Sequence, residues 1–127
     1  MAQTLSEMNP GELAFVGDAV YSLFVRRYIA VSEKYKNSEL HPASAEIVCC
    51  EAQAKGADSI FENLTEEEKE VFIKGKNMHH GSYPRHSSRG DYCKATGLEA
   101  LFGWLYLSGQ SHRAEELFSI ITGIQVN

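Results

Sequence analysis

Two acidic residues stand alone in strongly apolar stretches of the sequence. Asp18 is the only charged residue within positions 13–25. Glu99 is the only charged residue within positions 95–112 when His112 is neutral. Acidic side chains are seldom fully buried without a partner, and neither stretch offers a basic residue three or four positions away. Each carboxylate must therefore take up a proton or find a partner elsewhere in the fold.

Together, the two acids could form a metal site. At about 5 Å and an effective dielectric constant near 20, two carboxylates repel each other by about 3 kcal/mol, and a divalent cation reverses the sign. Oxygen ligands without Cys or His favour Mg²⁺, with Mn²⁺ as a substitute. Asp18 and Glu99 are thus predicted to be catalytic metal ligands for attack by activated water on a phosphate. In the alternative reading, each acid is hydrogen-bonded to backbone or to a Tyr hydroxyl and is structural.

A basic segment precedes the second acid. Residues 74–94 contain five lysines and arginines against one acid, Asp91, in a chain of net charge −5. A local basic patch on an acidic protein is the electrostatic footprint of a nucleic-acid contact, and basic and amide side chains suit phosphate oxygens. The candidates for this contact, with RNA as the nucleic acid that the resemblance given below implies, are Lys74, Lys76, Asn77, Arg85, Arg89 and Lys94. A solvated loop without a function is the alternative, and a zinc site at His79, His80, His86 and Cys93 matches no usual finger spacing.

Composition bounds the class of protein. A chain of 127 residues, 43% hydrophobic and 23% charged, predicts one soluble globular domain over residues 1–127. No stretch resembles a signal peptide or a membrane span, and three cysteines fit a reducing compartment. We therefore expect a cytoplasmic protein without a membrane partner.

Helical periodicity dominates the chain and predicts an all-α fold. Asn9, Pro10 and Glu12 form the start of a helix that is apolar on both sides over residues 13–25, so we expect it to be buried at the centre of the domain. Further helices are expected at residues 42–61 with a break near Gly56, from a Thr65 capping box to 74, at 92–107, and from a Ser111 cap to 121, with a long loop at 75–91.

Three stretches resemble a known family. Residues 13–21, Leu-Ala-Phe-Val-Gly-Asp-Ala-Val-Tyr, resemble the signature of ribonuclease III, and residues 98–107, Leu-Glu-Ala-Leu-Phe-Gly-Trp-Leu-Tyr-Leu, resemble its second acidic helix. Residues 74–77, Lys-Gly-Lys-Asn, are similar to a basic-Gly-basic-Asn run of the Mini-III branch, and Tyr92 and Thr96 stand where that branch has comparable residues. The resemblance covers about residues 10–121.

The resemblance implies a ribonuclease III catalytic-domain-like helical bundle without a separate RNA-binding domain. Such a protein forms a homodimer and cuts both strands of double-stranded RNA with Mg²⁺, leaving 5′-phosphate and 3′-hydroxyl ends. Asp18 and Glu99 match the catalytic Asp and Glu. Two further acids of the longer family pattern are replaced here by Ala14 and Thr96, a thinning that Mini-III shares. The branch is associated with maturation of precursor 23S ribosomal RNA, where a ribosomal protein could take part.

Three other functions are compatible with parts of the sequence. A non-catalytic RNA-binding or ribosome-associated module would keep the basic segment and need neither acid. A metal-dependent nucleotide hydrolase of another helical family would need more clustered acids or a His-Asp pair. A helical interaction protein would use Phe102 and Trp104 as a contact face. Loss of RNA cleavage on substitution of either acid separates the nuclease from all three.

Overall fold

The computed structural model describes residues 2–78, 83, 85 and 88–123, and its regular elements within these ranges are all helices. In chain order they are η1 Leu5–Glu7, α1 Pro10–Ser32, η2 Asn37–Glu39, α2 Leu40–Val48, α3 Cys50–Ile60, η3 Phe61–Asn63, α4 Glu66–Lys76, α5 Arg89–Leu107 and α6 Ser111–Thr122. The all-α prediction is confirmed. No helix in the described part of the chain combines the length and apolar character needed to cross a membrane.

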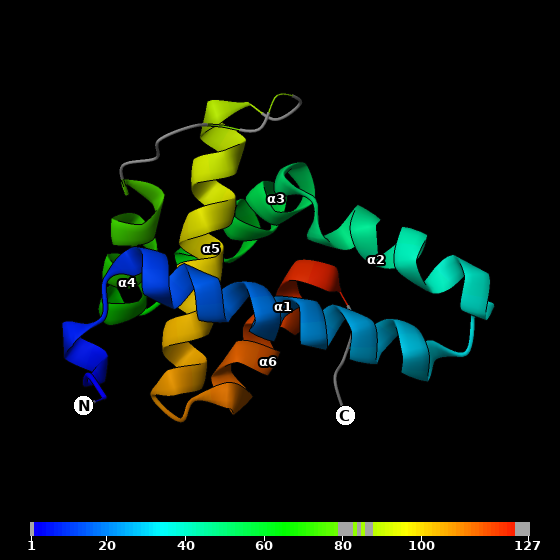
Figure 1. Cartoon of the computed structure of the whole chain (residues 1–127), viewed down its shortest axis with the longest axis horizontal. Helices are drawn as coiled ribbons and strands as arrows, with labels where there is room; N and C mark the ends of the chain where they lie inside the picture. The colour runs from blue at the N-terminus through cyan, green and yellow to red at the C-terminus, as the bar shows by residue number, and fades with distance from the viewer. Residues whose placement is uncertain (1, 79–82, 84, 86–87, 124–127) are drawn as a thin grey trace.

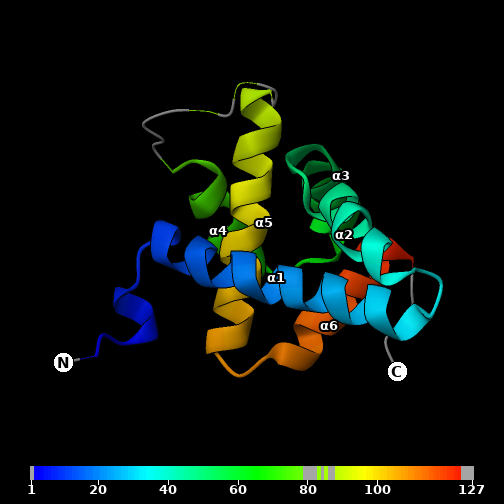
Figure 2. The ribbon, with the colours of Figure 1, turned by 45° about the vertical axis from the view of Figure 1, so that its right-hand side comes forward.

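Helix α5 is the centre of the arrangement. Helices α1, α3, α4 and α6 all pack on it, and α1 crosses in front of it in both views of the ribbon (Figures 1 and 2). Helix α4 lies on one side of α5 and α3 on the other, while α2 runs beside the C-terminal half of α1 (Figure 1). Residues that are distant in sequence therefore meet along α5.

Helix α1 begins where its capping residues predict. The Asn9 side chain accepts a hydrogen bond from the Glu12 backbone N–H at 2.8 Å, and the Asn9 N–H donates to the Glu12 carboxylate at 3.0 Å. Pro10 fills the first helical position, where its missing N–H costs nothing. This capping box fixes the start of the helix that carries Asp18.

The crossing of α1 and α5 depends on two glycines. A Cβ built on Gly17 would lie 1.6 Å from the carbonyl oxygen of Glu99, and one on Gly103 would lie 1.9 Å from that of Leu13. The two backbones are therefore in direct contact, closer than any side chain would permit. Below the crossing, Tyr21 packs edge to face on Phe102 and Phe118, with ring centroids 5.1 and 5.5 Å apart. These buried rings fix how the two helices meet.

An ion pair joins α4 to α6. Thr65 caps α4 in the predicted capping box with Glu68, and the Glu68 carboxylate also accepts two hydrogen bonds from Arg113, at 2.8 and 2.9 Å. Arg113 donates a third hydrogen bond to the Asn63 carbonyl at 2.8 Å. Glu68 is only 3% exposed, and burial of its charge requires this bidentate partner.

Two predicted helix breaks, at Gly56 and Gly75, are wrong. In both places the glycine allows a neighbouring element to pack closely against a continuous helix. The helical region at 42–61 is interrupted at Cys49, whose backbone is extended, and continues through Gly56. Gly56 is buried where a Cβ would lie 2.8 Å from the side chain of Ile121. Gly75, predicted to begin the long loop, lies within α4, where a Cβ would lie 2.7 Å from that of Ala100.

The remaining corrections concern the ends and one face of the helices. Helix α5 begins at Arg89, not Tyr92, because the Ser88 side chain caps it by accepting from the Asp91 N–H at 3.0 Å. Ser111 is the first residue of α6 and not its cap. Helix α1 is not buried on every side, since Phe15 is 82% exposed and Leu23 is 64% exposed.

Candidate active site

Asp18 and Glu99 meet where α1 crosses α5. Gly17 precedes Asp18 and lies against the backbone of Glu99, so the close crossing brings the two acids to one place. Asp18 is exposed and Glu99 is partly buried, and their carboxyl groups interact through space and by a hydrogen bond. The structure thus juxtaposes two residues that are far apart in the sequence, while their catalytic role stays a prediction.

The electrostatics of Glu99 are strongly perturbed. Burial, followed by the negative charge of Asp18 and the hydrogen bond to Asp18, raises the pKa of Glu99 to about 8. A proton shared with Asp18 therefore satisfies the pair near neutral pH when no cation is present. The retained proton relieves the repulsion between the two carboxylates, and a bound cation would relieve it in the same way.

Two further residues surround Glu99. Burial and the charge of Glu99 raise the pKa of Tyr21, which keeps its hydroxyl group neutral. The side chain of Gln53, from α3, hydrogen-bonds the Glu99 carboxyl group and favours its ionised form. The sequence reasoning missed Gln53. A signal was present, because Gln53 shares the spacing of the buried residues Ala57 and Ile60 on an otherwise apolar face of α3.

The donor set of this site consists of oxygen atoms. Within residues 2–78, 83, 85 and 88–123, no group of three or more His, Cys, Asp or Glu side chains comes together as potential metal ligands. The positions of the two missing family acids are occupied by Ala14 and Thr96, both buried, and the Thr96 hydroxyl donates to the Tyr92 carbonyl at 2.9 Å. Two carboxylates fit a cation such as Mg²⁺, which keeps several waters and binds phosphate oxygens.

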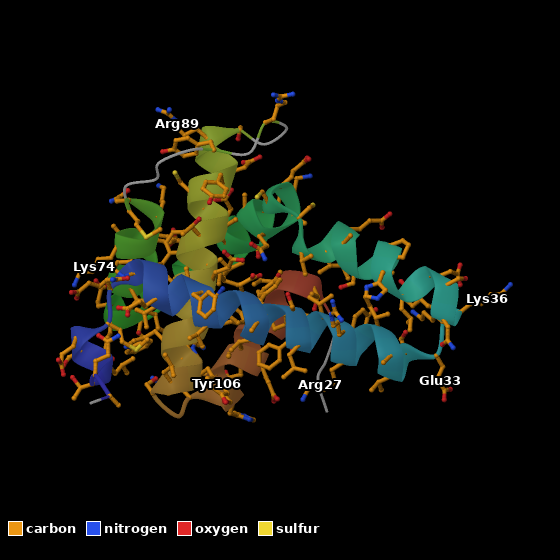
Figure 3. All side chains as sticks on the ribbon, in the orientation of Figure 1. Arg27, Glu33, Lys36, Lys74, Arg89 and Tyr106 are labelled. Atoms are coloured by element: carbon orange, nitrogen blue, oxygen red, sulfur yellow. The ribbon has the colours of Figure 1, made fainter. Side chains whose placement is uncertain are left out.

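The residues predicted to bind RNA do not gather at one point. Figure 3 shows Lys74 beside α4 and Arg89 at the far end of α5. The Lys74 ammonium pairs with Glu70 at 3.0 Å, and the Lys94 ammonium pairs with Asp58 of α3 at 2.9 Å. Two of the predicted cations are therefore partly neutralised by acids on the protein itself.

The other candidates are exposed. The Arg89 guanidinium stacks over the Tyr83 ring, 4.4 Å from its centroid, while Arg85 and Lys76 are open to solvent. Asn77 is the C-cap of α4, and its backbone N–H donates to the Ile73 carbonyl at 2.9 Å. Lys76 and Lys94 both line a groove formed by α3, α4 and α5. The histidines of the zinc alternative, His79, His80 and His86, lie outside the described residues.

Comparison with known proteins gives the class. The model of the ribonuclease III domain matches residues 11–110, a range that includes both acids. A crystal structure of a protein from Fusobacterium nucleatum superposes with a TM-score of 0.85 at 27% identity, covering 96% of this chain and 98% of that one. The chain therefore belongs to the ribonuclease III family, and it is an endoribonuclease.

The branch follows from individual relatives. A Mini-ribonuclease 3 of Brevibacillus brevis is 40% identical over 119 residues, covering 91% of this chain and 89% of that protein. Another, from Thermoanaerobacter sp. (strain X514), is 37% identical over 113 residues, covering 89% and 80%. The resemblance of residues 13–21 and 98–107 to ribonuclease III is confirmed, and so is the resemblance of residues 74–77, Tyr92 and Thr96 to its Mini-III branch.

Proposed function

We propose that this endoribonuclease hydrolyses double-stranded RNA at the Asp18–Glu99 pair with Mg²⁺ as cofactor. The observation that carries the proposal is the α1–α5 crossing, where Gly17 lies against the backbone of Glu99 and brings the Asp18 and Glu99 carboxyl groups together. Burial and the facing Asp18 carboxylate accordingly raise the pKa of Glu99 to about 8. Placing two carboxyl groups together costs free energy through repulsion and desolvation. Such an arrangement is more typical of a cation-binding site than of a purely structural hydrogen bond. Mn²⁺, with similar oxygen preference, is expected to replace Mg²⁺.

The acidic pair, Tyr21 and the basic segment have different roles in the proposed reaction. When bound, the cation stabilises charge on the scissile phosphate and makes water a better nucleophile near neutral pH. Asp18, which is exposed on α1, and Glu99, which is partly buried on α5, would hold the cation. Tyr21 interacts electrostatically with Glu99, and its hydroxyl group stays neutral. The basic segment binds backbone phosphates and 2′-hydroxyls, and thereby presents the duplex to the acids.

A second copy of the chain is the proposed partner that completes the enzyme. Phe15 stands one turn before Asp18 on α1 and is 82% exposed, and Leu23, two turns after Phe15, is 64% exposed. Exposed Ala19 stands between them at i, i+4 spacing, so the three residues form one apolar stripe, and a contiguous exposed patch is typical of an interface. In a twofold dimer the same face meets itself, so two acidic pairs lie on one assembly and can each cut one strand.

The biological substrate proposed is the precursor of 23S ribosomal RNA, with a ribosomal protein as a further participant. This part of the proposal rests on the Mini-III resemblance of residues 74–77, Tyr92 and Thr96. Incubation with precursor 23S RNA, with and without ribosomal proteins, should give cleavage at a discrete site. A random duplex of the same length should be cut more slowly.

The deciding experiment uses conservative substitutions of the two acids. With Mg²⁺ the unaltered protein should cut a long RNA duplex, and EDTA should stop it. Asp18→Asn and Glu99→Gln should each lose cleavage while retaining the circular dichroism spectrum and RNA binding. Glu46→Gln, at an exposed glutamate of α2, is the matched control and should cleave normally. Cleavage at the unaltered rate by either acid variant would contradict the assignment.

A further inference from the structure

An ion pair joins α3 to α5 at one of the residues predicted to bind RNA. The Lys94 ammonium lies 2.9 Å from one carboxylate oxygen of Asp58 and donates a hydrogen bond to the other at 3.0 Å. The Lys94 side chain is 33% exposed and that of Asp58 is 64% exposed. Because an ion pair so open to solvent contributes little to stability, a structural role is a weak reason for its presence.

The pair lies in the groove formed by α3, α4 and α5. Two bases, Lys76 and Lys94, and two acids, Asp58 and Glu62, line this groove, so its formal charges cancel. Within the part of the chain that the structure describes, Lys76 and Glu62 form no ion pair. Lys94 precedes Glu99 by five positions on α5, about 7.5 Å along the helix axis, so the groove lies close to the acidic site.

We propose that Asp58 is a positioning residue and a built-in competitor for RNA, holding the Lys94 ammonium in the groove with a carboxylate that an RNA phosphate must displace. The inference rests on the proposed function for the identity of the ligand, and on the geometry of the ion pair for its mechanism. Asp58 touches no RNA in this scheme. It acts through Lys94.

The exchange has a defined electrostatic sign. When a phosphate oxygen replaces Asp58 as the partner of Lys94, the ammonium keeps one anionic partner, but Asp58 becomes an unpaired negative charge beside the RNA backbone. The groove therefore attracts RNA less than its two lysines alone would. Removing the Asp58 charge should strengthen RNA binding, whereas loss of a purely structural link between α3 and α5 should weaken binding or leave it unchanged.

The direct test measures RNA binding without cleavage. In a Glu99→Gln background with EDTA present, Asp58→Asn should bind a short RNA duplex about threefold more tightly at low salt. The slope of log affinity against log salt should become steeper by up to about one. Asparagine keeps an oxygen that can accept from Lys94 and removes only the charge. Asp58→Glu keeps the charge and should bind like the parent.

Two further variants separate the ion pair from a general change of charge. Glu115→Gln frees Arg27 from its 3.2 Å ion pair, so it makes the same charge change outside the groove. It should alter affinity less than Asp58→Asn does. In a Lys94→Met background, Asp58→Asn should have no more effect than Glu115→Gln, because the residue through which it acts is gone.

Kinetics give an independent measure. With Glu99 intact and Mg²⁺ present, Asp58→Asn should lower KM about threefold at unchanged kcat, since binding gained equally by the ground state and the transition state does not speed the reaction. Asp58→Asn that binds RNA no more tightly than Glu115→Gln, or that still tightens binding after Lys94→Met, would overturn the competitor role. Cleavage by Asp18→Asn or Glu99→Gln would instead overturn the proposed function and leave the binding result in EDTA standing.

Discussion

Gly17 and Gly103 face each other where α1 crosses α5. A Cβ on Gly17 would lie 2.8 Å from the Gly103 backbone nitrogen, and one on Gly103 would lie 2.9 Å from the Gly17 nitrogen. Both distances are shorter than real Cβ contacts, and the obstacle in each case is backbone, which cannot rotate away. This backbone contact sets the spacing of the two helices that carry Asp18 and Glu99.

Alanine at either glycine should therefore separate the helices. We expect Gly17→Ala or Gly103→Ala to reduce the free energy of unfolding by about 2 kcal/mol or more, the cost of overpacking against a rigid neighbour. Each should also lower cleavage, because the acids move apart. Urea unfolding and a cleavage assay measure the two effects. Gly90→Ala, on α5 with open space around its Cβ, is the control and should stabilise by up to about 1 kcal/mol.

The raised pKa of Glu99 predicts how stability depends on pH. The unfolded chain releases this proton near pH 4.5 and the folded chain near pH 8, so between these values the folded state binds more protons. Without metal, stability should fall as the pH rises from about 5 to 8.5. The effect is at most roughly 5 kcal/mol, and smaller to the extent that solvent screens the pair.

Glu99→Gln isolates this contribution. Urea unfolding in EDTA should show a pH-dependent difference between the variant and the unaltered protein that grows up to about pH 8.5. Added Mg²⁺ should stabilise the unaltered protein more at pH 8.5 than at pH 6, because bound cation competes with the proton. A difference between the two proteins that stays constant with pH would show that Glu99 is not perturbed.

Where a capping box is present, the sequence predicts the start of a helix better than its interior. Capping boxes at Asn9 and Thr65 are local, since each residue and its partner are three positions apart, and the structure has both. The predictions at Gly56 and Gly75 were wrong because the sequence alone does not distinguish a glycine at a tight helix contact from a glycine in a loop. Only the packing partner, Ile121 for Gly56, distinguishes the two cases.

The acidic pair could be expected from sequence because a charge in an apolar helix conflicts with burial. Gln53 could not be expected with the same force, since an amide among alanines conflicts with little until α3 is placed against Glu99. Exposure of Phe15 was equally hidden, because periodicity cannot distinguish a core residue from an interface residue. In both cases the environment of the residue depends on which other helix or chain packs against it, and local sequence preferences do not determine that packing.

The buried pair of Glu68 and Arg113 should contribute more to stability than its surface counterparts. Arg113→Leu leaves the 3% exposed carboxylate without its bidentate partner, which should cost about 3–5 kcal/mol. Arg27→Leu removes the partly exposed bond to Glu115, 3.2 Å long, and should cost at most about 1 kcal/mol. Urea unfolding at pH 7 compares the two variants.

The same pair should show the opposite pH dependence to Glu99. Hydrogen bonds from Arg113 lower the pKa of Glu68, so its stabilisation is present above pH 4.5 and is lost as the pH falls through the folded pKa. The stability difference between the unaltered protein and Arg113→Leu should thus shrink in acid. Equal differences at pH 7 and pH 3 would show that the ion pair is not the cause.

Basic residues of α4 should weaken RNA binding in a salt-dependent way when removed. In a Glu99→Gln background, which prevents cleavage, Lys74→Ala with Lys76→Ala should lower affinity and reduce the slope of log affinity against log salt by about one per lysine. Lys34→Ala with Lys55→Ala, at two exposed lysines outside α4, is the charge-matched control. If both variants bind alike at every salt concentration, the α4 lysines have no part in binding.

Exposure of Phe15 gives the last prediction, on the oligomeric state. The protein should sediment as a dimer, and Phe15→Ser should shift it toward monomer, since a buried Phe contributes about 1.5–3 kcal/mol and a twofold interface contains it twice. A loss of about 3 kcal/mol corresponds to at least a hundredfold weaker association. Ile73→Ser, at an exposed apolar residue of α4, should leave the dimer intact. The monomeric variant has one acidic pair instead of two, so it should keep its fold but no longer cut both strands of a duplex in one binding event. A Phe15→Ser protein that remains dimeric would place the interface on another face.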